Sequence, residues 1–281
     1  MTVAYNSRPC CKNPNTSQMI ATGPVNRPRS ASQRRPYNSW PIILDHFTGL
    51  IIKFPTVNHP TQGQFVVNTK FLVDATGRQA NICRKVGVPS SKLDRLIGVG
   101  AFIQFEDKAT LPHDQLLETV ESGWWYSALL PDNILTIVFF SDSDIIAKHH
   151  LNKNDNWNRL LLETKHMKQR VRSATALDSK PWVRNASTRI SNLPECRNFL
   201  AIGDAAASFD PISSMGIGFA MTSALQAARI IQEELAEHHP QRVPHYQQEI
   251  GQHFEHYLQL RKRFYQQEKR WPSADFWVRR N

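Results

Sequence analysis

The sequence predicts a mixed α/β (α+β) fold, in which a domain with parallel strands is interrupted by an antiparallel sheet and followed by C-terminal helices. A short apolar run, Phe199–Ile202, ends at Gly203-Asp204 and precedes a helical pattern that opens at Gly216. This strand–loop–helix order is typical of a buried parallel sheet. Three β-rich segments between residues 97 and 140 predict the antiparallel sheet.

The N-terminal segment has the composition of a disordered chain. Residues 1–38 are rich in Pro, Ser, Asn, Thr and Arg, show no hydrophobic period and predict a disordered basic leader. A transit peptide is the alternative, but the prolines would interrupt its amphipathic helix. An unstructured leader is the favoured interpretation.

A second buried strand is expected before the turn Asp74-Ala75-Thr76-Gly77. The stretches 41–54 and 63–77 look like strands, and 66–67 with 71–73 suggest a hairpin that leads into the buried strand. A short helix is predicted from Asn81 to Val86, ending at Gly87.

The antiparallel sheet is predicted from strands at 97–106, 123–130 and 134–140, with a turn at Pro131-Asp132-Asn133. Three aromatic residues lie together in its middle strand. Trp124 and Tyr126 are expected on one face and Trp125 on the other, because side chains alternate along a strand. One face is expected to pack on the core and the other could line a pocket, although ordinary packing explains each residue equally well.

Three helical stretches follow. An amphipathic helix is predicted over 155–172, and a final helix over about 244–269. In the helix that opens at Gly216, apolar residues at three- and four-residue steps predict the buried face: Ile217, Ala220, Met221, Ala224, Leu225, Ala228, Ile231 and Leu235. Trp271, Phe276 and Trp277 are interpreted as packing residues.

Composition and charge narrow the functional classes. The net charge is +10, yet residues 41–260 are close to neutral, with 21 basic and 22 acidic side chains. Nucleic-acid-binding enzymes more often carry a basic stripe across the folded body, and here the basic residues gather at the two ends. An accessory protein that binds nucleic acid is therefore the least favoured of the functional interpretations. We expect no membrane span and no metal site, and four cysteines without a CxxC pair favour the cytoplasm.

Asp204 is the strongest candidate for chemistry. A carboxylate at the end of a buried strand can accept a hydrogen bond from a sugar-like hydroxyl, and a following helix N-terminus favours negative charge. The plain alternative is a crossover with an incidental acid.

The longer pattern is more specific than Asp204 alone. Gly203-Asp204-Ala205-Ala206, Pro211 and Gly216-Ile217-Gly218, together with the earlier D-A-T-G-R at 74–78, resemble the motifs of FAD-dependent oxidoreductases of the aromatic-hydroxylase type. The similarity is to the tryptophan-halogenase-like and geranylgeranyl-reductase-like groups. The run from Trp124 to Pro131 is similar to a halogenase signature but departs from it, so halogenation, hydroxylation and reduction stay open.

The resemblance implies an FAD-binding Rossmann-like domain with an inserted substrate domain. Asp204 is then expected to bind the FAD ribitol, and the loop from Pro211 to Gly218 to lie against the flavin ring. The implied cofactor-binding residues are Thr76, Gly77, Gly203, Asp204, Pro211, Gly216, Ile217 and Gly218. The implied substrate residues are Trp124, Trp125 and Tyr126. The implied substrate is a small-molecule or protein-borne aromatic group, with a flavin reductase as a candidate partner.

The resemblance covers residues 40–281 and lacks the N-terminal G-x-G-x-x-G unit of the family. The expected division is a leader at 1–38, a partial FAD-binding domain at 39–95 and 184–240, a β-sheet substrate domain at 96–183, and a C-terminal helix and tail at 241–281. A truncated, inactive relative that acts as an interaction module is therefore the alternative to a flavin-dependent monooxygenase- or halogenase-like enzyme.

Overall fold

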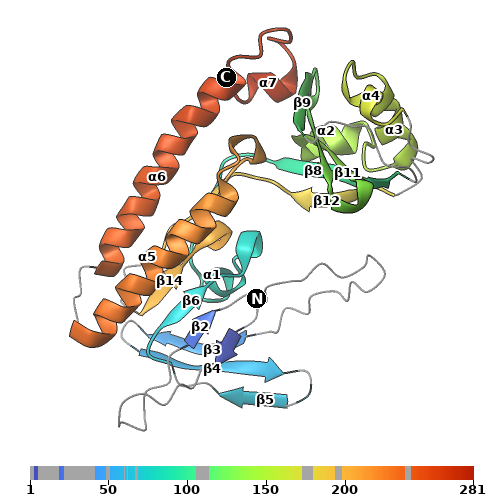
Figure 1. Ribbon diagram of the computed structural model, residues 1–281. Helices are drawn as coiled ribbons and strands as arrows, with labels where there is room; N and C mark the ends of the chain where they lie inside the picture. Colours follow the sequence, from blue (N-terminus) through green and yellow to red (C-terminus); the bar gives the residue numbers. More distant parts are fainter. Residues whose placement is uncertain are drawn as a thin grey trace. The chain divides into compact units, whose positions relative to one another are not determined.

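The computed structural model describes residues 3–5, 19–21, 42–48, 51–59, 61, 63–66, 69–105, 114–172, 180–193, 198–237 and 242–281. The chain forms two compact units (Figure 1). Unit 1 comprises residues 1–91, 189–208 and 214–254. Unit 2 comprises residues 92–188, 209–213 and 255–281. Within the described residues, no helix combines the length and apolar character needed to cross a bilayer.

Unit 1 combines short sheets with one long helix and the first part of another. Its strands are β1 (Val3–Tyr5), β2 (Met19–Ala21), β3 (Ile42–Thr48), β4 (Ile51–His59), β5 (Gly63–Val66), β6 (Leu72–Asp74), β13 (Arg189–Ser191), β14 (Phe199–Ala201) and β15 (Ala207–Ser208), with β7 (Ser90–Lys92) at its boundary. Its helical elements are the 3₁₀ turns η2 (Gly77–Gln79) and η4 (Gly203–Ala205), and the α-helices α1 (Asn81–Lys85), α5 (Gly216–Glu237) and the start of α6 (Arg242–Tyr265).

The predicted parallel pairing in unit 1 is confirmed. Strand β6 pairs in parallel with β14, with Leu72 opposite Phe199 and Asp74 opposite Ala201. Both strands are short and apolar, and all three residues of β14 are buried, as expected for a parallel sheet covered on both faces. The carboxyl ends of the two strands therefore meet at one edge, where the turns η2 and η4 begin.

Two other strand predictions in unit 1 need adjustment. Strand β5 pairs with β4 in the antiparallel sheet β3-β4-β5, so the expected hairpin between 66–67 and 71–73 is not formed. In the predicted leader, β1 pairs with β2, and the remaining residues of 1–38 lie outside the described part of the chain.

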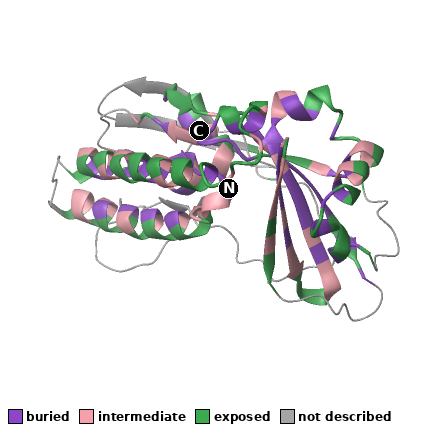
Figure 2. Ribbon diagram, turned by 90° about the horizontal axis from the view of Figure 1, so that it is seen from above, coloured by how far each residue is buried: buried purple, intermediate pink, exposed green. Residues whose placement is uncertain are grey.

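Helix α5 forms where predicted, but its expected buried face is wrong. Ile217, Met221 and Leu225 are 80%, 64% and 66% exposed, and Ala228 is exposed as well. The buried positions are instead offset by two residues: Phe219, Ser223, Ala227 and Ile230. Apolar residues occur around most of this helix, so the three-to-four-residue period alone selected the wrong stripe. Figure 2 shows exposed and half-buried residues along much of both long helices.

Unit 2 is built on a five-stranded antiparallel sheet in the order β12-β8-β11-β10-β9. Its strands are β8 (Leu96–Gln104), β9 (Gln115–Val120), β10 (Gly123–Leu130), β11 (Ile134–Asp142) and β12 (Trp182–Asn185). Its helical elements are η3 (Pro131–Asn133), α2 (Ser143–Lys148), α3 (Asn154–Leu162), α4 (Met167–Arg170), η5 (Pro211–Ser213), the end of α6 and α7 (Asp275–Val278). The three predicted strands and their turn are confirmed. Strand β12 pairs with β8 at one edge of the sheet.

The two faces of this sheet have separate cores. Trp124 and Trp125 lie on opposite faces, as the side-chain alternation predicted, and both faces are packed. Trp125 packs on one face with Phe139 and Trp157, and its ring lies 5.1 Å from that of Trp157. Trp124 packs on the other face against Phe140, with their ring centroids 4.2 Å apart. Phe276 and Trp277 belong to this second core, and Trp271 packs against it, so their interpretation as packing residues is confirmed.

The helix predicted over 155–172 is two helices. The chain leaves α3 after Leu162 and re-enters a helix at Met167, where the Glu118 carboxylate accepts N–H bonds from residues 165, 166 and 167. Such a carboxylate satisfies N–H groups that a helix start leaves unpaired. Arg170, in the second of these helices, is buried and forms an ion pair with Asp114.

The C-terminal tail of unit 2 is held by a buried ion pair. Arg280 donates two hydrogen bonds to Asp142, at 2.6 Å to Oδ1 and 3.0 Å to Oδ2, and both side chains are buried. Arg279 pairs with the half-exposed Asp144 at 2.8 Å. Arg279 also donates to Asp142 Oδ2 at 3.0 Å, so Asp142 binds both arginines of the tail, and its pair with Arg280 is the buried one.

We expect Asp142→Asn to lower the free energy of unfolding of unit 2 by roughly 3–5 kcal/mol, because it leaves the Arg280 charge buried without a carboxylate. Asp144→Asn should cost less than about 1 kcal/mol, since its pair is exposed. Urea titration followed by tryptophan fluorescence measures both. Equal losses of unfolding free energy in the two variants would contradict the conclusion that the buried pair contributes more than the exposed one.

Gly123, at the start of β10, cannot carry a side chain without distortion. Its φ is +154°, and an added Cβ would lie 2.2 Å from the carbonyl oxygen of Phe140. Gly123→Ala should therefore cost roughly 2–4 kcal/mol in unfolding free energy. Gly251→Ala, in the open interior of α6, should instead stabilise by about 0.5–1 kcal/mol. Urea titration followed by circular dichroism tests the opposite signs, and a loss in both variants would refute the steric explanation.

Candidate functional site

Two turns at the carboxyl ends of β6 and β14 bring together the predicted site residues of unit 1. Thr76 and Gly77 lie in the turn after β6, and Gly203 and Asp204 in the turn after β14. The turns are tied together by the Ile202 N–H, which donates to the Asp74 carbonyl at 3.0 Å. The predicted motifs, far apart in sequence, are therefore neighbours in the fold.

The first turn is organised by Asp74. Its Oδ1 accepts the Thr76 N–H at 2.9 Å and the Thr76 hydroxyl at 2.6 Å, and its Oδ2 accepts the Cys83 N–H at 2.7 Å. The Thr76 hydroxyl also accepts the Asn81 N–H at 2.6 Å. The polar atoms of both side chains and the Thr76 N–H are thus committed to the turn, and the cofactor contact predicted for Thr76 stays a prediction. Gly77 has a φ of +67°, and no atom lies within 4 Å of the position that a Cβ would take, so no side chain covers the backbone of the turn there.

The second turn lies against helix α5. Gly203 has φ of +53°, and an added Cβ would lie 3.2 Å from the Cβ of Ala220. Its N–H donates to the Ser223 hydroxyl at 3.0 Å. Glycine is therefore required both by the left-handed backbone and by the close approach of the helix. Ser223 was not predicted as a site residue, and its hydroxyl on the buried face of α5 satisfies the N–H of this turn.

Asp204 is the partly exposed carboxylate of this edge. Its Oδ2 lies 3.5 Å from Arg78 Nε, and both side chains are about one-quarter to one-third exposed. Its Oδ1 is buried and accepts no hydrogen bond from the described residues. Burial raises the pKa of Asp204, and the charges of Arg78 and Arg189 oppose that rise. An oxygen in this state is a vacant acceptor for a ligand donor.

Arg189 supports the backbone of the second turn. Its Nη2 donates to the carbonyl oxygens of Asp204 at 2.9 Å and Ala205 at 3.4 Å, and its Nη1 donates to the Ser191 hydroxyl at 2.8 Å. The Ser191 hydroxyl in turn donates to the Ala205 carbonyl at 2.7 Å. Sequence patterns gave no signal for Arg189, because it comes from a separate strand, β13.

The start of α5 is open. An added Cβ at Gly216 or Gly218 would meet nothing within 4 Å, and the side chain of Ile217 is largely exposed. The first turn of this 22-residue helix carries backbone N–H groups that lack partners within the helix, which favours negative charge nearby. The three residues predicted from the glycine motif thus form an accessible surface.

Cys83 is not a nucleophile at this edge. Its thiol is buried, and burial, followed by the charge of Asp74, raises its pKa far above the usual range. The thiol is therefore protonated near neutral pH.

The other predicted residues lie in unit 2. Pro211 begins η5, after Asp210, whose buried carboxylate accepts the Tyr265 hydroxyl at 2.7 Å and Arg261 Nε at 3.2 Å. Trp124 and Trp125 are fully buried, and Tyr126 is half-buried. The Trp124 indole N–H donates to the Tyr265 hydroxyl at 3.1 Å. Burial assigns both tryptophans to packing in this structure, and their contact with a substrate stays a prediction.

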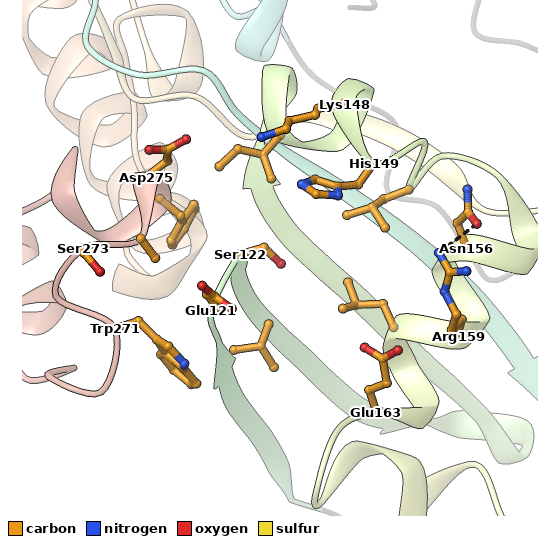
Figure 3. Close-up of a pocket in the computed structure, with 16 residues that line it drawn as sticks. Glu121, Ser122, Lys148, His149, Asn156, Arg159, Glu163, Trp271, Ser273 and Asp275 are labelled. Atoms are coloured by element: carbon orange, nitrogen blue, oxygen red, sulfur yellow. Dashed lines mark hydrogen bonds between the residues drawn. The ribbon is translucent and has the colours of Figure 1, made fainter.

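Unit 2 also contains a cleft of about 890 Å³ (Figure 3). None of the predicted cofactor- or substrate-binding residues lines it. Lys148 and His149 at the end of α2 and Arg159 on α3 supply basic groups, and Glu121 and Asp275 supply acidic ones. Trp271 adds an aromatic surface. These residues come from four separate segments, so no sequence motif could have grouped them.

Comparisons with known proteins agree with the motif resemblance. Residues 56–281 match the family described as tryptophan halogenase. LodB of Marinomonas mediterranea, whose assigned name is FAD-dependent oxidoreductase, is 42% identical over 225 residues, which cover 79% of this chain and 59% of LodB.

Solved structures share the fold. The flavin-dependent halogenase CmlS superposes with a TM-score of 0.70 at 22% identity, over 81% of this chain and 42% of CmlS. QhpG, described as a peptidyl tryptophan dihydroxylase, gives a TM-score of 0.67 at 24% identity, over 83% of this chain and 53% of QhpG. The chain thus spans about half the length of these structures. Because the family match covers most of the sequence, the chain belongs to the tryptophan halogenase family.

Proposed function

We propose that this chain contributes the ribityl-binding edge of a flavin-dependent oxidoreductase that acts on an aromatic group. The observation that carries the proposal is Asp204, whose Oδ1 is buried without a partner at the carboxyl end of a parallel strand pair. Membership of the tryptophan halogenase family and the similarity to LodB support FAD as the cofactor.

The residues present fit such a cofactor. Asp204 Oδ1 would accept a hydroxyl of the ribityl chain, and the N-terminus of α5 would favour negative charge on the reduced ring. Gly77, Gly216 and Gly218 leave their surroundings open, which permits a close approach of a ligand to the backbone. FAD, when bound, would supply the electron transfer and the oxygen chemistry, while the chain orients it.

An aromatic side chain within a peptide is the substrate class we favour. QhpG, which has the same fold, is described as acting on peptidyl tryptophan. The open cleft of unit 2, with basic and acidic groups beside Trp271, is compatible with a polypeptide, which offers both kinds of polar group. Monooxygenation and halogenation both remain within this proposal, and a flavin reductase as electron donor stays a prediction.

A non-catalytic interaction module is the second candidate. The exposed apolar stripe Ile217, Met221 and Leu225 favours it, because contiguous apolar surface often marks a contact with another polypeptide.

Titration with FAD distinguishes the two candidates. We expect the purified chain to bind FAD, measured by the change in flavin fluorescence, and Asp204→Asn to weaken binding by roughly 10- to 100-fold, since it removes a charged hydrogen-bond acceptor. Glu255→Gln, at an exposed position of α6, is the control and should bind like the wild type. Absence of binding by the wild-type chain would contradict the first candidate and favour the second. Equal affinity of Asp204→Asn and wild type would remove Asp204 from the site.

A further inference from the structure

Asp204 faces a cation that no part of the proposed function has used. Arg78 comes from η2 and Asp204 from η4, so the two side chains reach across from the two turns that end the parallel strands. Their closest charged atoms, Nε and Oδ2, are 3.5 Å apart. Both groups remain partly accessible, so a ligand at this edge would meet them together.

The other charged groups near Asp204 bind partners other than its carboxylate. Arg189, from β13, directs its guanidinium at the backbone carbonyls of Asp204 and Ala205 and at Ser191. Asp74 is saturated by Thr76 and Cys83. In the described part of unit 1, Arg78 is therefore the residue that forms the ion pair with the Asp204 carboxylate.

The two oxygens of Asp204 consequently have different states. Oδ2 faces the Arg78 guanidinium, whereas Oδ1 is buried and has no donor among the described residues. A carboxylate with one oxygen held and the other vacant presents a single acceptor in a fixed direction. This suits one hydroxyl of a polyol chain.

We propose that Arg78 is a positioning residue for the cofactor: it holds Oδ2 of Asp204, so that Oδ1 of the carboxylate is directed to one ribityl hydroxyl. This inference rests on the proposed function and assigns a role to a residue outside the predicted site list. Arg78 acts through Asp204, not through the phosphates of the cofactor.

The charge of Arg78 also sets the pH range over which Asp204 can act. Burial raises the pKa of Asp204, and of the two arginines that oppose this rise, Arg78 has the larger effect. Removing Arg78 would raise the pKa further, so the carboxylate would become protonated at a higher pH. Ligand binding that needs the carboxylate would then be lost earlier as the pH falls.

The experiment compares Arg78→Gln, Arg78→Lys and Arg84→Gln with the wild type. Arg84 is a matched control, because it lies on α1 after the same turn and donates an exposed hydrogen bond to the Asn81 side chain. FAD and riboflavin are titrated against each protein between pH 5 and 8, with flavin fluorescence as the readout. Riboflavin contains the ribityl chain without phosphate, so it separates the two ways in which an arginine could act.

We expect Arg78→Gln to weaken FAD and riboflavin by the same factor, roughly 3- to 10-fold at neutral pH, and more at pH 5. Arg78→Lys should recover part of the affinity, because it keeps the charge but not the planar guanidinium. Arg84→Gln should bind like the wild type. In an Asp204→Asn background, Arg78→Gln should have no further effect, since the residue through which it acts is gone.

Three results would overturn the proposal. These are a wild-type affinity and pH profile in Arg78→Gln, a loss restricted to FAD, which would place Arg78 on a phosphate, and an undiminished effect in the Asp204→Asn background. A flavin-free measurement tests the pair separately: ¹³C NMR of labelled aspartate should show a higher Asp204 pKa in Arg78→Gln than in Arg84→Gln. An unchanged Asp204 pKa refutes only the role of Arg78 and leaves the proposed function standing. Failure of the wild-type chain to bind either flavin refutes the proposed function, and with it the assignment of a flavin as the ligand of this edge.

Discussion

The parallel pairing of β6 with β14 is the constraint on which the proposed site depends. Parallel strands end at the same edge, so the pairing brings two turns from distant parts of the sequence within contact. Three features then follow from backbone geometry: the left-handed glycines Gly77 and Gly203, the approach of α5 to η4, and the ion pair between Arg78 and Asp204. A change that separated the strands would remove all three at once.

Three aspartates near the ends of these motifs illustrate how environment separates structure from function. Asp74 receives three hydrogen bonds and fixes a turn. Asp210 is fully buried in unit 2, and its carboxylate is held by Tyr265, Arg261 and the Ile212 N–H. Asp204 alone among them keeps a buried oxygen without a donor in the described residues. Incomplete satisfaction, and not the motif by itself, is what distinguishes the carboxylate that is available to a ligand.

Features that depend on the local sequence pattern were predicted correctly. Strand β10 has the predicted bounds, the turn at Pro131–Asn133 has two residues with positive φ, and the alternation of Trp124 and Trp125 between two cores follows from strand geometry. The glycine and aspartate motifs also identified the edge of the parallel pair. These features need no knowledge of distant contacts.

Features that depend on which surfaces meet were not predictable. The buried face of α5 is set by contacts of the helix within unit 1, and an apolar pattern on several sides cannot reveal it. Arg170 is buried because Asp114 arrives from another segment, and the break before Met167 depends on Glu118 of β9. The cleft of unit 2 likewise gathers residues from four segments.

The hydrogen bond from the Leu93 N–H to the Thr188 carbonyl, at 3.0 Å, closes the long insertion between the two parallel strands. The Thr188 N–H also donates to Asp94 Oδ1, at 3.2 Å. Once the insertion has folded and joined its own ends, the entropy lost in bringing β6 to β14 falls to that of a much shorter connection. We therefore expect the insertion to fold before β6 pairs with β14, and its closure to favour that pairing.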